Sequence, residues 1–61
     1  MTLQESEGKK VKVYFVDGES MTGTVSYYTS ALDNEPDPAS ITIGHVELFE
    51  PEIKRIELLN T

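Results

Sequence analysis

The sequence predicts a single all-β domain, a small five-stranded barrel with a short helical turn before the last strand. Apolar and polar residues alternate with a period of two near both ends of the chain, which is typical of half-buried strands. An Asp17-Gly18 pair separates two alternating stretches, as in a β-hairpin. The chain has 61 residues and no cysteine. Its core must therefore form without disulfides.

The start of the chain lacks the alternating pattern. Residues 1–8 are mostly polar and end in a glycine, so we expect a disordered tail and place the barrel domain at residues 9–61. The first strand follows at residues 9–16, with Val11 and Val13 on one face.

The second predicted strand covers residues 19–29. Its alternation places Val25 and Tyr27 on the core face, and Tyr28 on the outer face. Gly23 has no side chain to pack and indicates a bend or bulge, which a small barrel needs in order to close.

The second half of the chain contains shorter predicted elements. Residues 30–38 hold two prolines and three carboxylates, and we interpret them as a loop. Strands are expected at residues 40–43 and 46–49. A single helical turn at residues 50–53 then leads to a last strand at residues 54–59.

The end of the chain also fits a helix. Pro51 suits a first helical turn, and acidic residues flank it. The apolar residues Phe49, Ile53, Ile56 and Leu59 fit a helical stripe. We favour the strand, because the preceding strands need an edge partner.

The charges limit the choice of partners. There are 11 acidic and 5 basic residues, for a net charge of −6, which disfavours nucleic acid as a partner. If the first and last strands pair, the basic residues gather on that pair: Lys9, Lys10, Lys12, Lys54 and Arg55. These residues would serve as a docking patch for an acidic or nucleic-acid partner. Alternatively, they would neutralise neighbouring acids such as Glu57 and protect an edge strand from aggregation.

Residues 16–28 resemble the first motif of the Sm-like (LSm) family of SH3-like small barrels. Gly18, Gly23, Val25 and Tyr28 fall in register with the two glycines, the apolar residue and the aromatic residue of that motif. The resemblance implies an SH3-like barrel. It also implies self-assembly, because Sm-like barrels form rings by pairing their edge strands.

The sequence departs from the family where RNA is bound. An Asp and an Asn of the family's base pocket correspond here to Thr29 and Asp33, and Gly44 has no arginine beside it. Asp33 accepts hydrogen bonds only and repels phosphate. RNA binding therefore stays an alternative to protein binding.

The sequence holds no catalytic or metal signature, so we expect no enzyme activity and no cofactor. His45 is the one histidine. Asp33, Glu35 and Asp37 have the spacing of a calcium loop, but Pro38 stands where that loop needs glycine. The candidate binding residues are Tyr14, Tyr28, Thr29, Asp33, Lys10, Lys12 and Arg55.

These observations predict a non-catalytic module that binds a partner protein or assembles with itself. The alternatives are an Sm-like RNA-binding protein and an acidic nucleic-acid mimic that inhibits a basic partner. Tyr14 and Tyr28 would form a contact surface, or pack across the strands. No apolar run reaches the roughly 20 residues that cross a membrane, and the first residues are not a secretory signal, so we expect a cytoplasmic protein.

Overall fold

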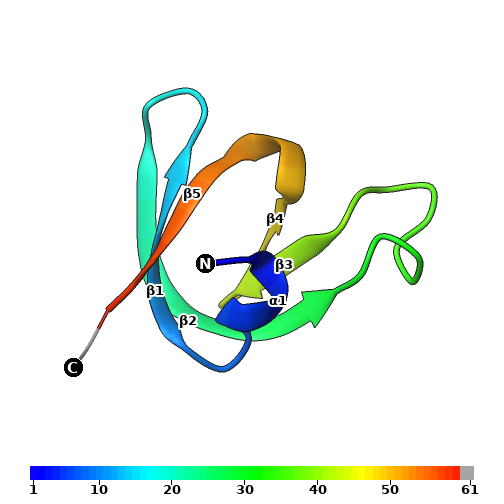
Figure 1. The fold of residues 1–61 in the computed structure, drawn as a ribbon, viewed down its shortest axis with the longest axis horizontal. Helices are drawn as coiled ribbons and strands as arrows, with labels where there is room; N and C mark the ends of the chain where they lie inside the picture. The colour runs from blue at the N-terminus through cyan, green and yellow to red at the C-terminus, as the bar shows by residue number, and fades with distance from the viewer. Residues whose placement is uncertain (60–61) are drawn as a thin grey trace.

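The computed structural model, described for residues 1–59, is a five-stranded antiparallel sheet curled around one apolar core (Figure 1). The strand order is β4-β3-β2-β1-β5. The strands are β1 (Lys10–Phe15), β2 (Ser20–Thr29), β3 (Ser40–Ile43), β4 (Val46–Phe49) and β5 (Ile53–Leu58). A short helix, α1 (Leu3–Ser6), precedes β1, and a 3-10 turn, η1 (Glu50–Glu52), precedes β5.

The strand predictions agree with this structure. β3 and β4 have the predicted bounds, and the other strands begin or end within one residue of theirs. The Asp17-Gly18 hairpin is confirmed: Gly18 has φ of 94° and donates its N–H to the carbonyl oxygen of Phe15 at 3.1 Å. The helix considered for the end of the chain is absent from residues 50–59. There, one 3-10 turn returns the chain to the sheet as β5.

The first and last strands pair as predicted, with Val13 opposite Ile56. β4 and β5 form the two edges of the sheet, and within residues 1–59 no ladder joins them. The all-β class is therefore confirmed, whereas strand pairing does not close the sheet into a barrel. The core side chains come from every strand: Val11, Val13, Val25, Ile41, Ile43, Leu48 and Ile56.

β2 belongs to two ladders, and it changes partner just after Gly23. Its first half pairs with β1 up to Thr24, and its second half pairs with β3 from Val25 onward. A Cβ atom added at Gly23 would overlap Cγ2 of Ile43. The glycine therefore lets β3 approach β2 at the point where the sheet turns over the core.

The bulge itself lies beyond Gly23, between Val25 and Tyr27, where the register with β3 shifts. The extra residue moves the later side chains to the opposite face. Tyr27 is consequently 64% exposed, and Tyr28 is half-buried against the core. The predicted orientations of both tyrosines were wrong, because strict alternation does not hold across a bulge.

The N-terminal residues are also placed differently from the expected disordered tail. Leu3 of α1 packs against the core, and Ser6 is fully buried. Gly8 donates its N–H to the Val25 carbonyl oxygen at 2.7 Å, and the Glu7 carboxylate accepts the N–H of Tyr28 at 3.0 Å. The segment belongs to the domain. The second half of β2 has turned away from β1, so the backbone groups of Val25 and Tyr28 are free to bond with Gly8 and Glu7.

The substitution Gly23→Ala tests the close approach of β2 and β3. We expect the free energy of unfolding to fall by about 1–3 kcal/mol, because Ile43 is β-branched and cannot easily move aside. Urea denaturation measures the change. Thr24→Ala is the matched control on the exposed face, with an expected change of about 0.5 kcal/mol or less. Equal stability of the two variants would contradict this account of the bend.

The capping box of α1 predicts a pH effect. The Glu5 carboxylate accepts the backbone N–H of Thr2 at 2.8 Å, and the Thr2 hydroxyl accepts the N–H of Glu5 at 3.2 Å. The backbone N–H of Thr2, followed by its hydroxyl, lowers the pKa of Glu5 from its ordinary value of 4.5. Because the folded-state pKa is depressed, the stabilisation is present above pH 4.5 and is lost as the pH falls through the lowered pKa.

We therefore expect an NMR titration to give the Glu5 carboxyl a pKa below its ordinary value. Glu5→Gln keeps an acceptor for the Thr2 N–H but does not titrate. The part of the acid destabilisation that comes from Glu5 should be absent in that variant. An ordinary pKa for Glu5 would contradict the capping box.

Candidate functional site

An aromatic ring with two cations lies on the outer face of β1 and β5. Tyr14 stands opposite Arg55 in the ladder. The Arg55 guanidinium carbon lies 4.2 Å from the centre of the Tyr14 ring, and the Lys12 Nζ lies 5.0 Å from it. Both distances are within the range of cation–π attraction. The ring therefore attracts both cations.

The predicted gathering of basic residues is present in the structure. Lys10 and Lys12 lie on β1, Lys54 and Arg55 lie on β5, and Lys9 directly precedes β1. A register shift opposite Phe15 leaves Lys54 outside the pairing. We define Lys10, Lys12, Tyr14 and Arg55 as the basic face, because they alternate with the buried Val11, Val13 and Ile56.

Glu57 neutralises only part of this face. Its carboxylate lies 3.6 Å from Nη1 of Arg55, and the two side chains are 46% and 60% exposed. Among residues 1–59 this is the one ion pair. Glu57 also stands opposite Lys12 in the ladder without forming an ion pair with it. The lysines therefore leave the basic face with a positive local charge.

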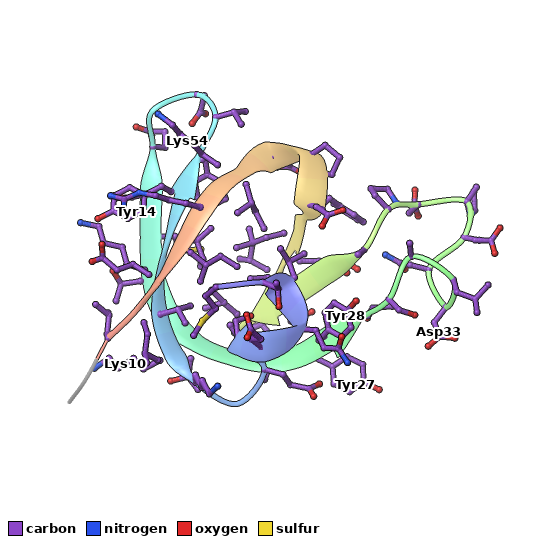
Figure 2. The ribbon with its side chains drawn as sticks, viewed as in Figure 1. Lys10, Tyr14, Tyr27, Tyr28, Asp33 and Lys54 are labelled. Atoms are coloured by element: carbon purple, nitrogen blue, oxygen red, sulfur yellow. The ribbon has the colours of Figure 1, made fainter. Side chains whose placement is uncertain are left out.

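The remaining candidate residues lie at the end of β2 and in the loop after it, and Figure 2 shows Tyr28 and Asp33 away from Lys10 and Tyr14. Tyr28 and Thr29 are half-buried at the end of β2, and Asp33 is exposed on the loop that follows. The Asp33 N–H is donated to the Ser30 hydroxyl at 3.2 Å. The structure therefore separates the seven candidates into two groups, with the basic residues in one and Thr29 and Asp33 in the other.

Hydrogen bonds from Asn34 hold the loop of residues 30–38 against the sheet. Asn34 donates its backbone N–H to Ser30 at 3.0 Å and its side-chain amide to the Pro38 carbonyl oxygen at 2.8 Å. The buried Ser40 hydroxyl accepts from the same amide and donates to the Glu47 carboxylate at 2.6 Å. The sequence did not indicate this series of hydrogen bonds, because it links a loop to a pair of strands.

Sequence reasoning also missed two apolar side chains on the edge strands. Val46 of β4 pairs with the buried Ile43, and Leu58 of β5 pairs with the buried Val11. Each shares the core face with its partner, yet Val46 is 45% and Leu58 is 44% exposed. They are exposed because their strands have a neighbour on one side only.

The backbone of both edge strands offers hydrogen-bonding groups. Leu59 donates its N–H to Lys10 at 2.9 Å, so alternation turns the N–H groups of Ile56 and Leu58 away from β1. Just after β4, the N–H of Glu50 is donated to the Ala39 carbonyl oxygen at 2.8 Å. The N–H groups of Glu47 and Phe49 therefore point away from β3. Each edge therefore presents two outward N–H groups with the carbonyl groups of the same residues.

The described residues enclose no pocket, and no three His, Asp or Glu side chains among them gather as a metal site. None of the helices in this part of the chain is long and apolar enough to cross a membrane. Comparison of the chain with protein-family models, curated proteins and solved structures found no significant match.

Proposed function

We propose that this chain is a non-catalytic protein-interaction module of the SH3-like (Sm-like) barrel type, which assembles with copies of itself. In this proposal β4 of one copy pairs with β5 of the next. The observation that carries it is the pair of edge strands, each with outward backbone groups and a half-exposed apolar side chain beside them. An unpaired edge is a template for another strand.

The strand order determines the geometry of such an assembly. β4 and β5 stand at opposite ends of the order β4-β3-β2-β1-β5, so the pairing uses two different surfaces of each copy. A contact of this kind is heterologous, and it closes into a ring when the rotation between copies permits. The order and the single 3-10 turn before β5 support the Sm-like type of barrel.

Apolar burial adds to the backbone hydrogen bonds. In the single chain, a little less than half of the surface of Val46 and of Leu58 is exposed to solvent. Complete burial of an aliphatic side chain contributes about 1.5–3 kcal/mol, so covering the rest contributes about 1 kcal/mol for each. Two such side chains at every contact favour an assembled state over separate copies.

The geometry supports self-assembly better than RNA binding or nucleic-acid mimicry. Thr29 is half-buried, and Asp33 adds a negative charge near it in sequence. The basic residues that could attract RNA lie on β1 and β5, and Figure 2 shows Lys10 and Lys54 away from Asp33. The only support for nucleic-acid mimicry is the net charge of −6. Many acidic proteins that do not mimic nucleic acid carry a similar charge.

The substitution Leu58→Lys tests the assembly. We expect the unaltered chain to have the mass of a multimer in size-exclusion chromatography with light scattering, and the variant to have the mass of a monomer. The added charge would be buried at the contact, where an unpaired ammonium is costly. Leu32→Lys is the matched control, because Leu32 is 78% exposed on the loop and distant from both edges in sequence.

Thermal unfolding of both variants separates assembly from folding. Leu58→Lys should unfold cooperatively as a monomer, since the side chain is partly exposed before assembly. A strict monomer in the unaltered chain, at every concentration tested, would overturn self-assembly. If Leu32→Lys lost assembly to the same extent, the proposal that β5 forms the contact would be wrong.

A further inference from the structure

We propose that the basic face binds an extended acidic segment of a partner protein. The face consists of Lys10, Lys12, Tyr14 and Arg55 on the outer side of β1 and β5. Within residues 1–59 its cations have one carboxylate partner, Glu57, although the chain has 11 acidic residues. Cations with so few internal carboxylate partners, gathered on one sheet face, provide the charge complementarity for such a ligand.

The net charge does not cancel this attraction. Charges further apart than a Debye length of about 8 Å are largely screened at physiological salt. The longest dimension of the molecule is 34 Å. The acidic loop with Asp33, Glu35 and Asp37 lies at the end away from Lys10 and Tyr14 (Figure 2). An approaching carboxylate therefore meets mainly the local positive charge of the basic face.

The cations are partly ordered before a ligand arrives. Tyr14 attracts Arg55 at 4.2 Å and Lys12 at 5.0 Å, so both long side chains lose less freedom on binding. The planar guanidinium of Arg55 can donate two parallel hydrogen bonds to one carboxylate. Binding would exchange its 3.6 Å contact with the exposed Glu57 for that closer arrangement.

The spacing of the lysines matches an extended peptide. Lys10 and Lys12 alternate along β1, and alternate residues of a strand repeat at about 6.6 Å. An extended ligand with carboxylates at alternate positions has the same repeat. Its acidic side chains can therefore meet Lys10, Lys12 and the neighbouring Arg55 without bending.

The arrangement around Tyr14 favours a peptide over single-stranded nucleic acid. Proteins that bind such strands stack bases on exposed aromatic rings. Here Arg55 and Lys12 already lie over the ring of Tyr14, and Tyr14 is itself half-buried. Carboxylates need only the cations and can bind without displacing them from the ring.

The test uses a short fluorescent peptide of alternating glutamate and threonine, measured by anisotropy at physiological salt and at higher salt. We expect binding that weakens as salt is added, and no binding of the same peptide with glutamine in place of glutamate. Lys12→Glu should weaken binding by up to about fivefold, the most that one exposed ion pair contributes. Lys12→Gln should weaken it less, because it introduces no negative charge opposite Glu57.

Lys9→Glu is the matched control. It changes the net charge as Lys12→Glu does, but Lys9 alternates with Lys10 and so lies off the basic face. We expect it to retain most of the binding. Equal weakening by the two variants would overturn the proposal, because net charge alone would then explain the attraction. Absence of peptide binding at physiological salt would overturn it too.

Oligo(U) is the competing probe. If it binds more tightly than the acidic peptide, and Lys12→Glu abolishes its binding, the face is a nucleic-acid interface and the peptide proposal is wrong. Thermal unfolding of each variant confirms that it is folded.

Discussion

The approach of Ile43 to Gly23 is the constraint on which the rest of the structure depends. Without a Cβ at Gly23, β2 can leave β1 and pair with β3 while the sheet turns over its core. In a domain this small, one flat sheet could not bury Val25 and Ile41 completely. The turn also exposes the second half of β2, which Glu7 and Gly8 then cover.

The two proposed interactions use different atoms of the same strand. Assembly uses the outward backbone groups of β5 with the half-exposed Leu58, whereas peptide binding uses Arg55 on the outer face. Both can therefore occur in one complex. Every copy in an assembled ring would present its own basic face, and several weak contacts to one acidic chain would combine into stronger binding.

The sequence by itself determined the elements whose causes are local. Alternation of apolar residues located the strands, and the Asp17-Gly18 turn followed from the conformational freedom of glycine. The short turn around Pro51 followed from proline and from the need for an edge partner. Pairing of the end strands then placed Lys10, Lys12 and Arg55 together, because register follows from which side chains must be buried.

Only the tertiary structure decided what depends on contacts between distant segments. The bulge after Val25 arises in the pairing with β3 and reverses Tyr27 and Tyr28, which alternation within β2 could not indicate. α1 is held by packing of Leu3 on a core that forms elsewhere. The exposure of Val46 and Leu58 follows from the position of their strands at the two edges. Such features arise where strands meet, and a periodicity read along one strand does not contain them.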